Sequence, residues 1–520
     1  MEHFNANVRA IPFDVLLSIM EMSRYRTILT IAGTCRTLYY APQSSRLLLR
    51  NGVLLRSSRA IESFLLFMLA DPATRFKHLH ALTFERGGFS EEAVDAIKNL
   101  LAHPLFNIDT LVLHDSEAVL SSGVPFVEGP NDDWSCAGTP LFEPFAGLTT
   151  IRHLTVDELG VRASTYLKML PSALISVSIK FGSAGPSWNR LMDANAYNPI
   201  VILARSAGTL EVLKGLPFSL PLLGSTIYKT IYPRVRMIEI GLLEDWMRGV
   251  VAYAHAYPNL EHFSLIEPER PRGWDEYLRM HTFIRADLER RRRRNREDQI
   301  TYGSWKSLQI LEGEISAVYV LGLACKVSEL RVVGVVEEDT AHYLEVVLSD
   351  VQPETLSLTV DGGSMFDEGS TLSRLLTAPI VKCITSLEME VRFAEAEGTS
   401  DMKQITNNIL LRTSGLLGLR KLTLVLNYAL LTSPYVGPGS WSPTPDGSER
   451  YHCSAERYLS DLDFRAYASR FREAIPTLQR VVVQRRMNRT GDMEKVGPYG
   501  FGWPPSPASS NGEQVDDNDG

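Results

Sequence analysis

The stretch YPNLEHFSL, residues 257–265, places apolar residues at Leu260, Phe263 and Leu265, with the polar Ser264 between the last two. A period of two is the pattern of a β-strand that buries one face. With Leu260 included, the order becomes apolar, two spacers, apolar, spacer, apolar. The same order returns in four other stretches, which are FKHLHALTF (76–84), WKSLQIL (305–311), LRKLTLVL (419–426) and IPTLQRVVV (475–483). The sequence therefore predicts one short strand that is repeated along the chain.

Short segments with this alternation recur from about residue 76 onward, near residues 79, 108, 151, 174, 235, 260, 308, 328, 354, 385, 419 and 478. Helical patterns lie between them, at 90–104, 245–258 and 339–350. Strands and helices that alternate at intervals of roughly 20 to 47 residues are typical of stacked βα units, as in leucine-rich repeats. A doubly wound α/β sheet shows a similar alternation, so that alternative stays open.

The composition is that of an ordinary globular protein. The chain has 520 residues, 44% of them hydrophobic and 22% charged, with a net charge of −8. An acidic average argues against a protein that binds phosphate backbones, so no nucleic acid is expected. The five cysteines are odd in number and widely spaced, which fits reduced thiols in a cytoplasmic or nuclear protein. The richest apolar stretch, 61–70, is too short for a bilayer span and contains Glu62, so no membrane association is expected.

Residues 11–50 predict a compact helical module. Pro12 suits the first turn of a helix, and a second helix covers 25–40 before Pro42. The apolar stripe of that second helix consists of Ile28, Ile31, Cys35 and Leu38, whereas Leu29 stands off the stripe with Gly33 and Arg36 beside it. The second helix therefore presents a second, partly apolar face. A module of about forty residues has a marginal core and would normally pack against something else.

No short catalytic motif is present, neither GxGxxG, nor a P-loop, nor GxSxG, nor HExxH. His78 and His80 are expected on one strand face, but no further ligand completes a metal site. The arginine run at 290–296 suits nuclear import or an acidic partner, and alternatively an exposed helix whose charges are offset by Glu289, Glu297 and Asp298. We therefore expect no catalytic residues, no cofactor and no metal.

The N-terminal module resembles an F-box, in the divergent form found in many fungal proteins. Ile11-Pro12 stands for the Leu-Pro of that family, Asp14 for its carboxylate, and Val15-Leu16 with Ile19 for its apolar run. The stretch LTIAGTCRTLYY, residues 29–40, resembles the second helix, with Cys35-Arg36 as the Cys-Arg pair. A leucine-rich-repeat-like region after an F-box is a frequent arrangement in the family.

The resemblance implies a partner for the second apolar face. F-box modules dock onto a Skp-type adaptor, which connects them to a cullin scaffold and a RING subunit. The resemblance implies that the adaptor is bound by six residues, which are Pro12, Leu16, Ile19, Leu29, Gly33 and Arg36. The stripe of Ile28, Ile31, Cys35 and Leu38 would pack inside the module.

The sequence thus predicts an α/β protein with a short three-helix F-box module followed by an irregular leucine-rich-repeat-like βα solenoid. The expected boundaries are 8–55 for the module, 56–75 for a connecting helix, 76–487 for the repeat region with loops at 121–147 and 432–452, and 488–520 for a disordered tail. The expected function is substrate recognition in an SCF-type ubiquitin ligase. The alternative is a non-enzymatic repeat scaffold without ligase association. A hydrolase or transferase on an α/β sheet is the third class.

Overall fold

The structure of the protein is a computed structural model. It describes residues 13–23, 25–34, 36–40, 42–50, 52–122, 141–180, 197–216, 228–241, 249–266, 283–394, 397–429 and 453–486.

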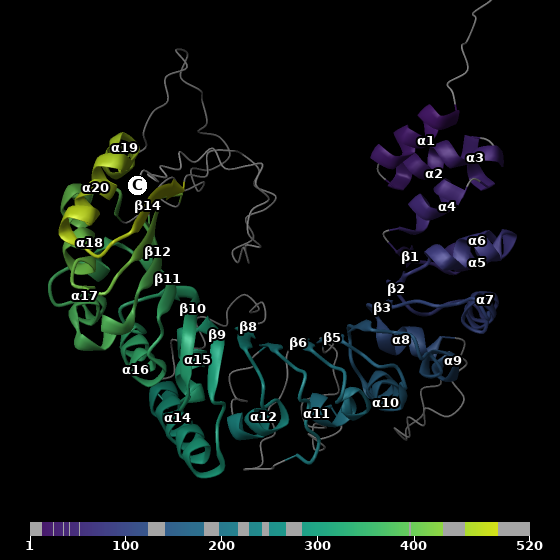
Figure 1. Cartoon of the computed structure of the whole chain (residues 1–520), viewed down its shortest axis with the longest axis horizontal. Helices are drawn as coiled ribbons and strands as arrows, with labels where there is room; N and C mark the ends of the chain where they lie inside the picture. Colours follow the sequence, from purple (N-terminus) through teal and green to yellow (C-terminus); the bar gives the residue numbers. More distant parts are fainter. Residues whose placement is uncertain are drawn as a thin grey trace, which may run out of the picture. The chain divides into compact units, whose positions relative to one another are not determined.

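The described chain divides into two compact units, which we treat separately. The first unit is formed by residues 1–218 and 228–235. It begins with four helices and continues with alternating strands and helices (Figure 1). Its elements are α1 (Phe13–Met22), α2 (Tyr25–Thr34), α3 (Arg36–Tyr40), α4 (Pro42–Leu49), β1 (Val53–Leu55), α5 (Ser58–Ala70), α6 (Pro72–Arg75), η1 (Phe76–His78), β2 (Ala81–Phe84), α7 (Glu91–Leu101), β3 (Thr110–Leu113), α8 (Ser116–Ser121), α9 (Phe142–Ala146), β4 (His153–Val156), α10 (Val161–Met169), β5 (Ser176–Lys180), α11 (Pro199–Ile202), η3 (Ala204–Ser206) and β6 (Val212–Leu216).

The second unit is formed by residues 219–227 and 236–520. In Figure 1 its helices lie on one side of its strands. Its elements are β7 (Met237–Gly241), α12 (Val250–Ala256), β8 (His262–Ile266), α14 (Phe283–Tyr302), β9 (Ser307–Glu314), α15 (Ile315–Leu321), β10 (Lys326–Val336), α16 (Ala341–Val351), β11 (Thr355–Asp361), η5 (Gly363–Phe366), α17 (Thr371–Thr377), η6 (Pro379–Cys383), β12 (Ser386–Arg392), α18 (Met402–Thr413), β13 (Lys421–Asn427), α19 (Ser454–Asp461), α20 (Phe464–Ala474) and β14 (Arg480–Arg486).

Both units are α/β, with parallel strands that pair in the order of the chain. In the first unit the pairs run from β1–β2 to β5–β6, and in the second unit from β7–β8 to β13–β14. A doubly wound sheet reverses its strand order at a switch point. Within the described residues of each unit the order never reverses, so the doubly wound alternative does not apply.

The predicted apolar pattern forms the core beneath the strands. At β8 of the second unit, Leu260 just before the strand and Phe263 and Leu265 within it are all buried. The same three positions at β3 are Ile108, Leu111 and Leu113. All twelve predicted strands are present. The strand β6 was not predicted, and the segment of β1 was predicted as part of the helical module. Neither strand carries the complete apolar pattern. In β6, Gly215 occupies the position where the third apolar residue is expected, and β1 has only three residues.

A backbone ladder fixes the register at the start of most strands. The amide of Asp109 donates to the carbonyl of His80, that of Arg152 to Asp109, and that of Ile175 to Arg152. The second unit repeats this arrangement from Glu261 to Gln479. Each strand is therefore held by its sequence neighbour before its side chains begin to alternate.

Among the described residues of the N-terminal module there are four helices, α1 to α4, where three were predicted. The predicted second helix, 25–40, corresponds to α2 and α3, and Cys35 between them lies outside the described residues. Pro42 is the first residue of α4, the position where its missing N–H costs nothing. The segment 56–75, predicted as a connection, forms α5 and α6. Because β1 precedes this segment and pairs with β2, α5 and α6 belong to the first strand–helix unit of the sheet.

Part of the predicted loop at 121–147 is helical. Residues Phe142–Ala146 form α9, in which Phe142 and Phe145 are buried. These two aromatic side chains anchor the segment to the core, which the turn-rich composition before it concealed. Residues 123–140 of that loop, the loop at 432–452 and the tail at 488–520 lie outside the described residues.

Candidate docking surfaces

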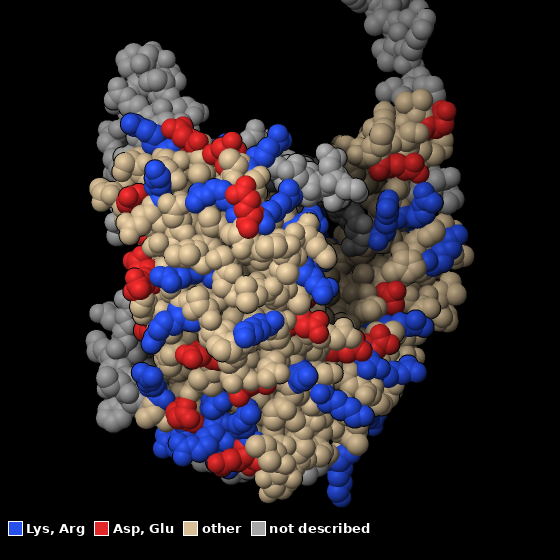
Figure 2. Space-filling view, turned by 60° about the vertical axis from the view of Figure 1, so that its left-hand side comes forward, with Lys and Arg blue, Asp and Glu red and all other residues tan. Residues whose placement is uncertain are grey.

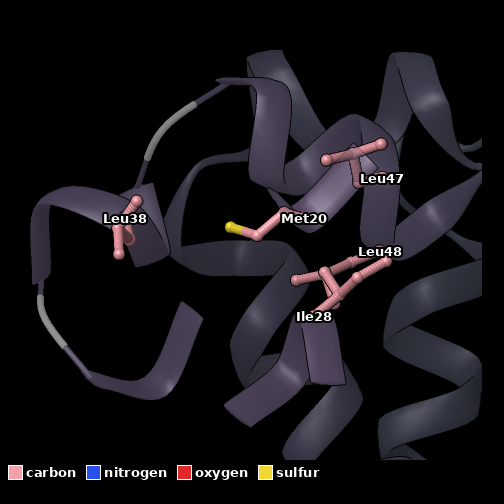
Figure 3. Close-up of a cluster of buried hydrophobic side chains, with 5 residues drawn as sticks. All are labelled: Met20, Ile28, Leu38, Leu47 and Leu48. Carbon is pink, nitrogen blue, oxygen red and sulfur yellow. The ribbon is translucent and has the colours of Figure 1, made fainter. Parts of the chain in front are cut away.

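A small apolar cluster holds the four N-terminal helices together. Its buried members come from all four helices and are Met20, Ile28, Leu38, Leu47 and Leu48 (Figure 3). Leu16, Leu17, Ile31 and Phe67 pack against them with partial burial. The predicted inward orientation of Ile28, Ile31 and Leu38 is therefore confirmed, whereas Cys35 lies outside the described residues.

The opposite side of α1 is apolar and exposed. Val15 is 42% exposed, Ile19 37% and Met22 83%. Their spacing of i, i+4 and i+7 places them on one helix face, away from the buried Met20. We call these three residues the outer stripe of α1. The outer stripe is a candidate docking surface, because its apolar side chains are exposed to solvent and do not contribute to the buried cluster.

The six predicted adaptor-binding residues are distributed differently from the expectation. Ile19 lies on the outer stripe, and Arg36 is exposed at the first residue of α3. Leu16 instead packs against the cluster. Leu29 and Gly33 lie in α2 and their side chains are outside the described set, as is the whole of Pro12. Val15 and Met22 were missed, although the helical spacing from Ile19 would have found them.

The second unit has another candidate surface, on the side of its strands away from the core. Alternate residues of β9 to β14 point there, and many are charged or polar. We call this the polar sheet face, and its main members are Glu312, Glu329, Arg331, Thr359, Glu388, Glu390, Arg392, Asn427 and Arg486.

Glu390 is the centre of one network on the polar sheet face. Its carboxylate accepts from Arg392 Nε at 3.1 Å, from Arg486 Nη1 at 2.7 Å and from Asn427 Nδ2 at 2.7 Å. These contacts join β12, β13 and β14 side by side. They also leave Arg486, whose side chain is 57% exposed, available for further contacts.

Carboxylates outnumber cations around Arg331. Its Nε donates to Glu329 at 2.6 Å. This hydrogen bond, with the charges of Glu329, Glu312 and Glu388, raises the pKa of the Arg331 guanidinium. His262 Nε2 lies 3.5 Å from the Glu312 carboxylate, and this contact lowers the pKa of Glu312. The middle of the polar sheet face is therefore fixed by charge pairs and carries a surplus of negative charge.

A cavity of about 450 Å³ lies at the carboxyl ends of β11 and β12, where Asp361, Asp367, Glu397 and Asp401 line it. Glu397 accepts from the amides of Gly363 at 2.6 Å and Ala394 at 3.1 Å, and burial raises its pKa. Asp401 accepts from the first amides of α18. Two of the four carboxylates thus hold backbone amides, which indicates a structural role rather than acid–base chemistry.

The arginine run is more deeply engaged than an exposed helix would be. It lies in α14, where Arg292 and Arg296 both pair with Asp350 of α16, at 2.6 and 2.8 Å. Asn295 and Gln299 are buried and donate to the last carbonyls of α15. One face of α14 therefore packs on its neighbours, and Arg290 and Arg294 remain exposed on the other.

Metal and membrane features are few in the part of the chain that the structure describes. No group of three histidine, cysteine or acidic side chains there has the arrangement of a metal site. His78 lies in η1 rather than on a strand, so it does not share a strand face with His80. Among the described residues, no helix combines the length and apolar character needed to cross a bilayer.

Basic and acidic side chains are interspersed over most of the face drawn in Figure 2.

No protein-family model matches the chain, and no curated protein matches it. The function therefore has to be inferred from the surfaces described above.

Proposed function

We propose that the chain is the substrate-recognition subunit of an SCF-type ubiquitin ligase. The N-terminal helices act as an F-box-like module that binds a Skp-type adaptor and, through it, a cullin. The parallel strands and their helices form an irregular leucine-rich-repeat-like solenoid that binds a target protein. The chain performs no bond chemistry itself. It raises the effective concentration of the target near the charged ubiquitin carrier.

The observation that carries the proposal is the outer stripe of α1. Val15, Ile19 and Met22 are exposed although the module already has an apolar cluster on the other side of the helix. Burying one such side chain in an interface contributes roughly 1.5 to 3 kcal/mol. A few anchors of this kind can dominate an interface. The F-box resemblance of residues 11–40 supports a Skp-type adaptor as the occupant.

The polar sheet face supports the target-binding half of the proposal. Consecutive parallel strands present an extended row of side chains, which repeat proteins use for binding. The charge pairs around Glu390 and Arg331 hold this row in a fixed arrangement. A surface that is charged and already ordered favours a specific protein partner, because little side-chain entropy is lost on binding.

Co-purification tests the adaptor. The full chain is co-expressed with a Skp-type adaptor, beside a variant that carries Ile19→Asp and Met22→Asp. The parent is expected to retain the adaptor, and the variant to lose it, because two carboxylates would be buried in an apolar interface. Circular dichroism shows whether the variant is folded.

A matched control carries Leu411→Asp and Leu417→Asp, at leucines that are 59% and 69% exposed in the second unit. This control is expected to retain the adaptor. A folded parent that captures no adaptor would contradict the proposal and leave the scaffold without ligase association as the better account.

A further inference from the structure

Phe67 of α5 reaches from the first strand–helix unit into the N-terminal module. Its side chain packs against the cluster formed by Met20, Ile28, Leu38, Leu47 and Leu48. Its ring meets the ring of Tyr39 in α3 edge to face, with centroids 5.7 Å apart. The module therefore completes its core with a residue from outside itself, as its small size requires.

Arg75 contacts both rings of this aromatic pair. It is 0% exposed, which is rare for an arginine, and it is the last residue of α6. Its guanidinium lies over the Phe67 ring at 3.9 Å and over the Tyr39 ring at 5.0 Å. Its Nη1 donates to the carbonyl of Phe67. One buried cation thus touches a residue of the module and a residue of the sheet side at once.

The sheet side of Arg75 is itself firmly held. The next residue, Phe76, is buried and stacks on His103 at a centroid distance of 4.3 Å and an interplanar angle of 3°. On α5, Ile61, Phe64 and Met68 are buried. Arg75 therefore cannot follow the module without disturbing the core of the first unit.

We infer that Arg75 is a positioning residue. Together with Phe67, it fixes the orientation of the N-terminal module relative to the strands and helices that follow it in the first unit. Resting on the proposed function, this gives the ligase receptor a fixed distance between its adaptor-binding helices and the first strands of the first unit. Removing the guanidinium leaves the module's own cluster in place but releases its orientation.

Single-molecule energy transfer within the full chain measures this directly. Two dyes are attached through unnatural amino acids at Ser18 in α1 and Glu92 in α7, which are both exposed. Adaptor capture is measured on the unlabelled proteins, because Ser18 lies on the same helix face as the outer stripe. The parent is expected to give one narrow distance distribution. Arg75→Met is expected to widen it at least twofold, while circular dichroism and adaptor capture stay as in the parent. If Arg75 only stabilised the module, Arg75→Met would widen the distance distribution only together with a loss of helix content in circular dichroism.

The matched control is Arg59→Met, the same substitution at an exposed arginine of α5, which is expected to keep the parent's distribution. A folded Arg75→Met variant with the parent's width would overturn the inference, and so would widening by the control. If Arg75→Met unfolds the module, Phe67→Leu decides, because leucine keeps the cluster filled but removes the ring beneath the guanidinium. The parent's width in that variant also overturns the inference. Adaptor capture by the parent is read separately, so failure of the proposed function is distinguishable.

Discussion

Tyr166 of α10 is fully buried, and its hydroxyl has no hydrogen-bond partner among the described residues. Burial raises the pKa of this phenol. An unsatisfied buried polar group costs roughly 1 to 3 kcal/mol. Tyr166→Phe is therefore expected to raise the free energy of unfolding by about 1 kcal/mol, measured by urea denaturation.

Tyr232 is the matched control for this prediction. It is also fully buried, but its hydroxyl donates to the carbonyl of Ile200 at 2.9 Å. Tyr232→Phe is expected to lower the free energy of unfolding by about 1 kcal/mol, because the carbonyl loses its donor. Equal changes of the same sign in both variants would show that the hydroxyls are not what decides stability here.

At the level of single residues, the sequence predicted the inward positions better than the outward ones. Ile28, Ile31 and Leu38 follow from helical spacing alone, since burial of an apolar stripe is a strong and local requirement. Leu16, which the family resemblance selected for the adaptor, packs partly against the inner cluster, and its role in adaptor binding stays a prediction. The role of Arg75 was not predictable, because its aromatic contacts Phe67 and Tyr39 are brought to it only by the tertiary fold.

Among the elements, α14 shows how a charged helix is held. Asp350 is 12% exposed at its side chain and pairs with both Arg292 and Arg296. Asp350→Asn is expected to lower the free energy of unfolding by roughly 2 kcal/mol, because two arginines lose their shared carboxylate in a poorly solvated place. Thermal or urea unfolding of the full chain measures this.

The comparison for α14 is Asp298→Asn, which affects a more exposed pair with Arg294 at 4.0 Å. That change is expected to cost less than about 0.5 kcal/mol, as for most surface ion pairs. If the two substitutions had equal effects, the packing of α14 on α16 would not depend on Asp350.

A second element-scale prediction concerns Glu117 of α8, whose carboxylate accepts from the amides of Ala163 at 2.8 Å and Arg162 at 3.3 Å in the first turn of α10. Burial raises its pKa above the usual 4.5, and the hydrogen bonds only partly oppose this. Its contribution to stability is therefore complete below about pH 4.5 and is lost as the pH rises through the folded-state pKa.

Glu117→Gln removes this titration while it keeps an oxygen that accepts from α10. The stability of the parent relative to this variant is expected to fall as the pH rises from about 4.5 through the folded-state pKa of Glu117. Urea midpoints at a series of pH values measure the difference. A difference that stays constant, or that grows with pH, would mean that the hydrogen bonds outweigh burial at this carboxylate.

The strands were readable from the sequence because each repeats the same local pattern, as Leu260, Phe263 and Leu265 illustrate. The helices were less so. The helix predicted at 25–40 corresponds to α2 and α3, on either side of Cys35, which lies outside the described residues. The helix α9 is short, and its buried side chains are Phe142 and Phe145. The packing of α14 depends on Asp350, which is distant in the sequence, so local charge balance could not reveal it.

For the whole molecule, the structure predicts that the N-terminal module depends on the sheet beside it. A fragment of residues 8–55 is expected to show no cooperative unfolding, because it lacks Phe67 and because the described part of its cluster has five buried members. A fragment that extends to residue 122 includes α5, α6 and β1–β3 and is expected to unfold cooperatively. Circular dichroism during heating distinguishes the two. A cooperative transition in the short fragment would show that the module is stable alone.

The pairing of strands in chain order has a consequence for the evolution of this protein. Among the described strands of each unit, none is inserted between two strands that are remote in sequence. Duplicating or deleting one strand together with its helix leaves the register of all the others intact. The sheet therefore lengthens or shortens in steps of about 4.8 Å, the spacing between neighbouring strands. Gene duplication within the chain is a direct way to adjust the reach of its binding surface.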